Sequence, residues 1–516
     1  MQTNSEQTSF LMPFGGDLDE SNRWVRLARL VPWAVVEEQY GKRFRRDRGG
    51  HRPLTARIAL GALLVKERLG LTDRETVEQI RENPYIQYFL GYASYSSAAP
   101  FDASLMVHFR TRLGMECVQA MNATVIEAMV RRTASRHEDV PKSDDDGRPP
   151  GWPSSSGDAN SGTGAGSAPA PATPIAPTGS LIIDATCAPA DITFPTDLKL
   201  LNHAREITER VIDVLHAAHA GMGLKPRTYR KRARRQFLAA AKSKKLKQSD
   251  RRVAAGKQLR FLRRNVHTID TALAAGRWTL KPLDRVLYQK LLVTSEVYRQ
   301  QTHLYRSKDR SVPDRIVSVS QPHIRPIVRG KAHAPTEFGA KISVSLVGGC
   351  ASLDRLSWDA YYEGADLPLQ AESFRARTGH YPAVVYADKA YTSRANRTWC
   401  SERGIRLAGI GPGRPPTDPQ AERARHRTRR DDEAARQPIE GVFGRAKRRW
   451  SLNRIMAKLA CTSACVIALV FLVMNLEALL TTILLGLIAC AVASILMWDI
   501  RWRRQAIHPP SALATR

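Results

Sequence analysis

The sequence predicts an α/β domain that is interrupted by a long helical insertion and preceded by an all-helical domain. Three observations lead to this fold class. Apolar residues recur at helical spacing from Asp19 to about Gly114, as in ARIALGALLVKERLG. Short apolar runs bounded by Pro and Gly, typical of buried strands, occur several times after residue 180. After the first of these runs, the segment from about Leu198 to Arg306 keeps helical periodicity with few strand signals.

Residues 1–134 are predicted to form the helical domain, which we expect to bind DNA. Within LTDRETVEQIRENPYIQYFLG, Thr72 is a suitable N-cap with Glu75 three residues later, a capping box, and a second short helix follows Asn83 and Pro84. Two short helices joined by a tight turn are compatible with a DNA-reading helix-turn-helix. Ordinary helix packing is the favoured interpretation, because basic residues are not concentrated on the second helix.

Residues 135–180 are dominated by Ser, Gly, Ala, Pro and Asp, which is typical of a flexible linker at a domain boundary. The α/β domain is expected over residues 181–476, with a basic helical insertion at about 198–310 that contains RTYRKRARR. Its predicted strands lie in SLIIDATCAPADITFPTD, AKISVSLVGG, SLDRLSWDA, AVVYAD and IRLAGI, and helices separate the later ones. This is the element order of an α/β sheet that is interrupted once.

The chain is strongly basic, with 79 Lys and Arg against 49 Asp and Glu and a formal charge of +30. Such a field favours a polyanion as partner, through phosphate neutralisation and counterion release. A basic ribosomal or membrane-surface protein would share this composition. The seven cysteines form no CxxC pair, which indicates reduced thiols in a cytosol rather than a disulfide framework or a zinc ribbon. The N-terminus has no basic segment followed by an apolar core, so we do not expect a secretory signal.

Two of the predicted strands are followed by an aspartate. Asp184 comes after SLII and Asp388 comes after AVVYA. An open α/β sheet displays functional groups at strand ends, because the chain leaves the sheet there and a crevice forms. Each aspartate alone is more often a turn former or a helix cap. The prediction of a site therefore depends on a third carboxylate.

That third carboxylate is Glu440, in QPIEGVFGRAKRRW. Pro438 is tolerated in the first turn of a helix, so the helix is predicted to start near Arg436. At about 100° per residue, Arg436, Glu440 and Lys447 share one face of this helix. A solvated i,i+4 ion pair is the plainer interpretation when the helix is considered alone.

Phosphodiester cleavage near neutral pH supplies the reason to combine the three carboxylates. Mg²⁺ prefers carboxylate oxygens, and two ions about 4 Å apart activate the attacking oxygen and stabilise the leaving one. Asp184, Asp388 and Glu440 are therefore predicted both as metal ligands and as catalytic residues. Asp431 and Asp432, which are expected in a polar run before the helix, are the less favoured alternatives.

Basic residues around these carboxylates are predicted to hold DNA phosphates. A charge run is more often a solvated face than a specific site, but the charge of the whole protein favours DNA contact for the insertion cluster RTYRKRARR, and Lys341 is also expected to track the DNA backbone. The residues predicted to bind DNA are Arg436, Lys447, Arg329, Lys331 and Lys389.

The assembled motifs resemble the DDE transposases of bacterial insertion sequences, in particular the insertion-sequence-five group. The motifs are FDASLMVHFRTRLG, DATCAPADITFPTD, RGKAHAPTEFGAKISVSLVGG, YPAVVYADKAYTSRANR and RQPIEGVFGRAKRRW, and the resemblance covers nearly the whole chain apart from the linker and the C-terminal tail. It implies a ribonuclease H-like mixed sheet with Asp184, Asp388 and Glu440 as its catalytic carboxylates.

Members of that family often have a Tyr, Arg, Glu, Lys signature around the glutamate. Arg436, Glu440 and Lys447 match the spacing, but Glu433 occupies the tyrosine position, so the role of that tyrosine does not carry over.

The resemblance implies an enzyme that hydrolyses a phosphodiester at the ends of its element and then uses the freed 3′-OH to attack target DNA. It implies two Mg²⁺ ions, for which Mn²⁺ is expected to substitute. The expected partners are double-stranded DNA, at terminal inverted repeats and in the target, and further copies of the chain on that DNA. The expected location is the bacterial cytoplasm, at the nucleoid. The alternatives are a catalytically inactive DNA-binding relic of the same fold and a membrane-tethered nucleic-acid-binding protein.

Residues 477–516 are predicted to form an apolar C-terminal helix and a basic tail. Glu477 is the only charge in LACTSACVIALVFLVMNLEALLTTILLGLIACAVASILMW, and Ala478 to Trp498 is long enough to span a bilayer. RWRR follows, as expected at a cytoplasmic end. Up to about Leu476 we expect an ordinary buried helix that covers the sheet. For the rest, a buried or oligomer-interface helix is favoured over a membrane span.

Overall fold

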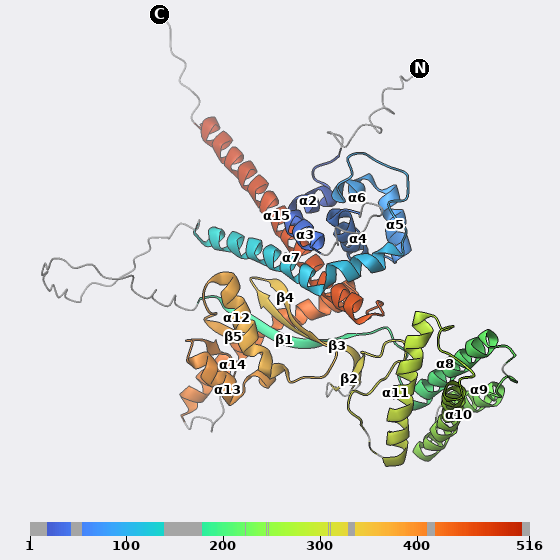
Figure 1. Cartoon of the computed structure of the whole chain (residues 1–516). Helices are drawn as coiled ribbons and strands as arrows, with labels where there is room; N and C mark the ends of the chain where they lie inside the picture. The colour runs from blue at the N-terminus through green and yellow to red at the C-terminus, as the bar shows by residue number, and fades with distance from the viewer. Residues whose placement is uncertain are drawn as a thin grey trace, which may run out of the picture.

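The computed structural model describes residues 18–42, 54–138 and 178–507. Within the last range, residues 222, 244, 246, 308, 310, 329–335 and 410–417 are not described. The side chains of residues 133–138 and 486–507 are not described either. In this structure, a mixed sheet lies between N-terminal helices on one side and a separate lobe of helices on the other (Figure 1). The predicted linker falls almost entirely outside the described residues.

The N-terminal part is helical, as predicted. Thr72 and Glu75 form the predicted capping box, in which each side chain bonds to the backbone N–H of the other residue. Asn83 caps the next helix, whose first residue is Pro84. The helices are α2 (Arg23–Leu30), α3 (Trp33–Gly41), α4 (Ala56–Leu69), α5 (Asp73–Glu82), α6 (Pro84–Phe89) and α7 (Leu105–Glu138).

The sheet has six strands and combines antiparallel and parallel pairs. β3 pairs antiparallel with β1 on one side and with β2 and β4 on the other, whereas β1, β5 and β6 are parallel neighbours. Five strands were predicted, but the short β2 was not. The strands are β1 (Ser180–Pro189), β2 (Arg325–Val328), β3 (Thr336–Val347), β4 (Cys350–Ser357), β5 (Val384–Tyr386) and β6 (Arg406–Leu407).

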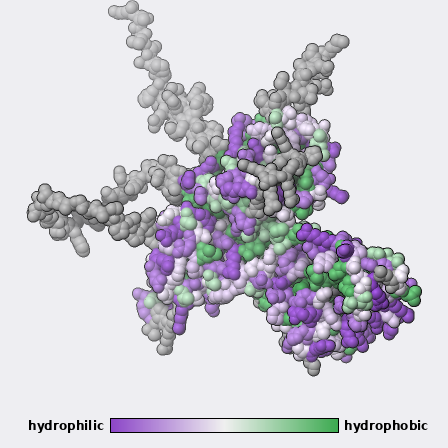
Figure 2. Space-filling view, in the orientation of Figure 1, coloured by the Kyte–Doolittle hydropathy of each residue, from purple (hydrophilic) through white to green (hydrophobic). Residues whose placement is uncertain are grey.

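The helical insertion is confirmed, and it has a hydrophobic core of its own. Leu201, Ile212 and Leu262 are among its buried residues. Figure 2 shows apolar side chains among the hydrophilic ones on the surface of this lobe, in line with the exposure of Val286 and Leu292. Its helices are α8 (Asp197–Ala218), α9 (Arg230–Lys242), α10 (Gln248–Ala274) and α11 (Arg285–Ser307).

The helix that carries Glu440 begins well before the predicted start near Arg436, so that prediction was wrong. α14 runs over Pro419–Arg449 with Pro438 in its interior. Asp418 caps it by accepting the backbone N–H groups of the second and third helical residues. Buried residues beyond the proline, including Ile439, pack this part of the helix and offset the missing backbone hydrogen bond.

Two shorter helices, α12 (Leu367–Thr378) and α13 (Arg394–Ser401), were predicted and lie between the last strands. Phe374 of α12 and Cys400 of α13 are buried against β1, β5 and β6, in a core that includes Ile183 and Leu407. These helices therefore cover one face of the parallel half of the sheet.

The C-terminal helix α15 (Ala460–Ile507) completes a hydrophobic core shared by the N-terminal helices, β3 and β4. Its segment Ala460–Leu485 is long and apolar enough to cross a membrane, but 67% of its most apolar window is buried inside the protein. The expectation of a buried helix up to Leu476 is confirmed. Side chains beyond Leu485 lie outside the described part of the chain, so the interpretation of residues 478–498 stays a prediction.

Candidate active site

The strand register brings the first two predicted carboxylates to neighbouring positions. Ile182 of β1 lies opposite Tyr386 of β5 in the parallel pair, and two residues further along each chain are Asp184 and Asp388. Asp388 follows the end of β5, as predicted. The prediction that Asp184 ends its strand was wrong, because β1 continues to Pro189 in its pairing with β3. The pairing with β5 nevertheless stops at Ile182, so Asp184 lies where β1 loses its parallel neighbour.

α14 brings the third carboxylate to the same place. The Arg436 guanidinium donates through Nη1 to Asp184 Oδ2 at 3.1 Å and through Nη2 to Glu440 Oε1. Arg436 therefore joins the first and third predicted carboxylates, and the predicted i,i+4 pair on this helix face exists. The Asp184 side chain is 19% exposed and that of Glu440 is 58% exposed, so the glutamate is the one open to a large substrate.

The electrostatics of Asp184 reflect these neighbours. Burial, helped by the negative charges of Asp388 and Glu363, raises the pKa of Asp184 to about 6. The backbone N–H of Ala185, which donates to Asp184 Oδ1 at 2.7 Å, and the charge of Arg436 act in the opposite direction. The negative charge gathered here favours a bound cation.

Glu363 is an acidic residue near this site that the sequence analysis missed. It begins the short 3-10 helix η1 (Glu363–Asp366), just before α12, and its carboxylate forms an ion pair with Lys341 Nζ. Lys341 also donates to the Tyr361 carbonyl and its side chain is 14% exposed, and its expected role in tracking DNA stays a prediction. The EGAD sequence at a helix start was the available signal, but the pairing with Lys341 joins distant parts of the chain.

The site contains oxygen donors that suit a metal ion, but they do not form a complete coordination site. Carboxylate oxygens are the ligands that Mg²⁺ prefers. The fully buried Tyr391 hydroxyl, whose pKa is raised by burial and then by the Asp184 charge, finds no hydrogen-bond partner among the described residues. Within the described ranges, however, no three His, Cys, Asp or Glu residues are grouped closely enough to hold an ion. Arg436 bonds to one oxygen of Asp184 and one oxygen of Glu440, so its guanidinium competes with a metal ion for these two oxygens.

The residues predicted to bind DNA are only partly described. Lys389 is exposed at the start of the 3-10 helix η2 (Lys389–Tyr391), and its backbone N–H donates to Asp388 Oδ1 at 2.6 Å. Lys447 is half-buried on α14 and interacts with another part of the protein. Arg329 and Lys331 lie outside the described residues.

The alternative carboxylates Asp431 and Asp432 are part of α14 rather than of a polar run before it, so that expectation was wrong. Asp432 is buried and accepts two hydrogen bonds from Arg406, at 2.8 and 3.2 Å, and one from the Gly409 N–H at 3.1 Å. These bonds attach α14 to the end of β6. Asp432 therefore has a structural role, which supports the preference for Glu440.

Comparisons with known proteins match two separate parts of the chain. Residues 385–477, which include Asp388 and Glu440, match the family model described as a transposase DDE domain. Residues 14–112, which include most of the N-terminal helices, match the model described as a transposase domain (DUF772). Asp184 lies between the two matched segments.

A curated relative from Rhizobium meliloti, described as an uncharacterized protein ORF8 in the nfe locus, is 37% identical over 117 residues. The alignment covers 22% of this chain and 55% of the relative, so the chain spans about half of the relative's length. No solved structure matches the chain.

Proposed function

We propose that this chain, which the two family matches identify as a DDE transposase of an insertion sequence, cleaves DNA at the ends of its element and joins those ends to target DNA. The observation behind the proposal is the convergence of Asp184, Asp388 and Glu440 from β1, β5 and α14 on one region, with Arg436 bonded to two of them. The excess positive charge of the chain supports DNA as the substrate.

In this proposal the three carboxylates hold two Mg²⁺ ions, for which Mn²⁺ substitutes. The ions supply Lewis acidity at the scissile phosphate and lower the pKa of the attacking water or 3′-OH. Arg436 leaves the carboxylates when the ions bind and pairs with a phosphate oxygen next to the cut. Lys389 and Lys447 hold neighbouring phosphates. The chain thus positions the reactants for in-line attack and needs no covalent intermediate.

The remaining features of the proposal concern architecture and assembly. A central β1 with antiparallel β3 on one side and parallel β5 on the other supports a ribonuclease H-like arrangement. We infer that the N-terminal helices bind the terminal inverted repeats and that at least two copies of the chain pair the ends in the bacterial cytoplasm.

The test uses the full chain and labelled duplexes that contain the element's own ends, which are identified as inverted repeats flanking the coding region. We expect strand cleavage with Mg²⁺ or Mn²⁺ and none in EDTA. Asp184→Asn, Asp388→Asn and Glu440→Gln should each lower the cleavage rate by at least about a hundredfold while end binding stays within about twofold. Glu433→Gln is the matched control, because Glu433 is exposed on the same helix and pairs only with Arg429.

Two outcomes would overturn the proposal. A wild-type protein that binds the ends but never cuts them, with either ion, would be an inactive relic of the fold. Loss of end binding in parallel with loss of cleavage in the three variants would mean that the carboxylates have a structural role.

A further inference from the structure

We propose that the outward face of α14 is a second DNA-binding surface, which holds duplex DNA by its phosphates and is distinct from the face that carries Glu440. This inference rests on the proposed function, because it assigns a further part of the same substrate to the catalytic helix. We call this surface the arginine stripe, and it consists of Arg423, Arg427, Arg430, Arg445 and Arg448.

The helical repeat aligns these five arginines. Their spacing of four, three, fifteen and three residues keeps them within about 30° of a common line at about 100° per residue. All five are exposed, as are the residues between them on the same line, Ala434, Gln437 and Gly441. The buried residues of α14, Asp432, Ile439, Val442 and Ala446, lie on the opposite side. The stripe is therefore the outward face of the helix.

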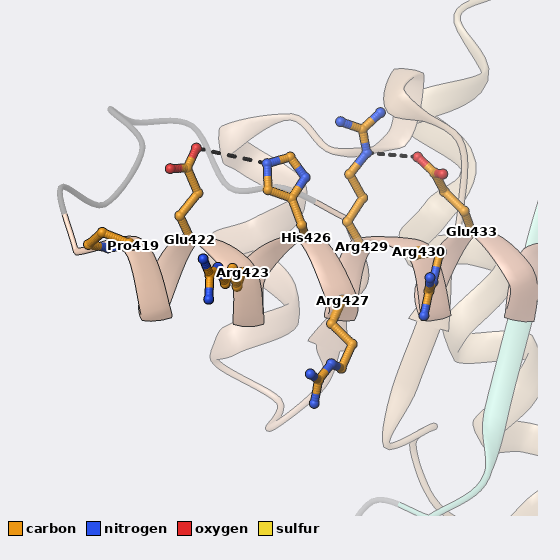
Figure 3. A pocket seen from close by; sticks show the side chains of 8 residues that line it. All are labelled: Pro419, Glu422, Arg423, His426, Arg427, Arg429, Arg430 and Glu433. Carbon is orange, nitrogen blue, oxygen red and sulfur yellow. Dashed lines mark hydrogen bonds and ion pairs between the residues drawn. The ribbon is translucent and has the colours of Figure 1, made fainter.

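The stripe is not neutralised by the protein. None of its five guanidiniums forms an ion pair within the parts of the chain that the structure describes. Three acidic residues of this helix segment pair with residues outside the stripe, since Glu422 pairs with His426, Glu433 pairs with Arg429 and Asp432 pairs with Arg406. Figure 3 shows the first two of these pairs on one side of the helix and Arg427 on the other. All eight residues drawn there belong to α14, so the hollow that they line is an open helix flank and not an enclosed cavity.

The dimensions of the stripe suit duplex DNA. Twenty-five residues of helix separate Arg423 from Arg448, which is roughly 37 Å at about 1.5 Å per residue. At about 3.4 Å per base pair this corresponds to roughly one turn of the duplex. A Cβ on Gly441 would meet no described atom within 4 Å, so the described residues leave space directly over the middle of the stripe. Five unpaired arginines on so long a line fit the regular charge of a DNA backbone better than a small anion.

The stripe and Glu440 point in different directions. They are separated by about 110° around the helix axis. DNA that contacts the stripe therefore lies beside the strand at the carboxylates, and the helix holds two segments of DNA at once. The ordinary alternative is that the stripe is a solvated basic face with no fixed ligand. The two interpretations predict a different salt dependence of the affinity for DNA when the stripe arginines are replaced.

The test measures affinity of the full chain for a duplex of unrelated sequence, in EDTA, at salt concentrations from 50 to 200 mM. Because cleavage does not occur under these conditions, failure of the catalytic proposal would not affect the result. Each phosphate contact contributes about 0.9 to the steepness with which log K falls with log salt. The triple variant Arg423→Gln, Arg427→Gln, Arg430→Gln removes three contacts and should therefore lower this slope by about 2.7. The loss of affinity across this salt range should then shrink by about fortyfold. Arg445→Gln with Arg448→Gln should lower the slope by about 1.8.

A matched control removes three positive charges elsewhere. Arg285 on α11, Arg394 on α13 and Lys458 in the segment before α15 are exposed and form no ion pair within the described residues, and their triple Gln variant should keep the wild-type slope. Circular dichroism and thermal melting of each variant establish that it is folded. A stripe variant with the wild-type slope would overturn the proposal. An equal fall in slope in the control would also overturn it, because net charge alone would then account for binding.

Discussion

The clearest physical test of the fold concerns Asn475, a buried polar residue within the apolar helix α15. Its Nδ2 donates to Asn122 Oδ1 at 2.7 Å and to the Ala351 carbonyl at 2.8 Å, and its Oδ1 accepts the Ala351 N–H at 2.9 Å. These bonds join α15 to α7 and β4. We consider the substitution Asn475→Leu, which keeps the number of side-chain heavy atoms and removes every one of these bonds.

The expected loss of stability follows from the buried polar groups that lose their hydrogen-bond partner. The Ala351 carbonyl keeps the hydrogen bond from Asn122 Nδ2 at 3.0 Å, so it stays satisfied. The Ala351 N–H and the Asn122 Oδ1 lose their partners in a buried place, and each such group costs about 1–3 kcal/mol. Asn475→Leu should therefore lower the free energy of unfolding by about 2–6 kcal/mol. That is a large part of the about 5–15 kcal/mol typical of a folded protein.

The assay is urea unfolding of the full chain in buffer without detergent, followed by circular dichroism. Thr481→Val is the control on the same helix, because Thr481 is exposed and its hydroxyl bonds only to the Glu477 carbonyl within the helix. The control should change the free energy of unfolding by less than about 0.5 kcal/mol. If Asn475→Leu instead left stability unchanged and moved the protein into washed membranes, the helix would be a membrane span and the reasoning would be refuted.

Three further variants probe contacts around the site and in the N-terminal helices. Burial raises the pKa of Asp73, but the hydrogen bonds and the charge of Arg110 outweigh burial and hold that pKa below its usual range. The pair therefore stabilises the fold at neutral pH, and this stabilisation is lost as the pH falls below about 4. Asp73→Asn should cost about 3 kcal/mol at pH 7 and progressively less in acid, measured by urea unfolding at several pH values. Pro438→Ala restores a backbone N–H donor inside α14 and should raise the free energy of unfolding by up to about 3 kcal/mol, measured by thermal melts. A lower free energy of unfolding would show that the fold requires the local helix geometry that Pro438 imposes. Asp432→Asn weakens the contact with Arg406 and should lower stability by about 1–3 kcal/mol while cleavage stays within about threefold, and complete loss of cleavage would give Asp432 a catalytic role instead.

Local patterns were sufficient to predict most elements. Helical periodicity located the N-terminal helices and the insertion, short apolar runs located five of the six described strands, and the cap at Thr72 was identified from its spacing to Glu75. The start of α14 was missed because Pro438 was taken as a first-turn residue, although Asp418 and Pro419 are themselves a cap and a first-turn proline.

What the sequence could not supply is long-range geometry. The register between β1 and β5, which brings Asp184 next to Asp388, depends on how two strands about two hundred residues apart align. The pairing of Lys341 with Glu363 and of Arg406 with Asp432 likewise depends on tertiary packing. No local pattern distinguishes a lysine that binds DNA from one that binds a neighbouring carboxylate.

The position of α15 sets the order in which the protein can mature. The helix packs against α2, α4 and α7, so these helices, which precede the sheet in the chain, are completed only after α15, which follows the sheet, has been made. Until then, the early helices lack a large part of the apolar surface that buries them, and they depend on the nascent chain staying soluble. A product shortened before residue 460 would therefore be a poor folder and a target for proteolysis. Under the proposed function, this coupling would limit the activity of incomplete copies of the chain.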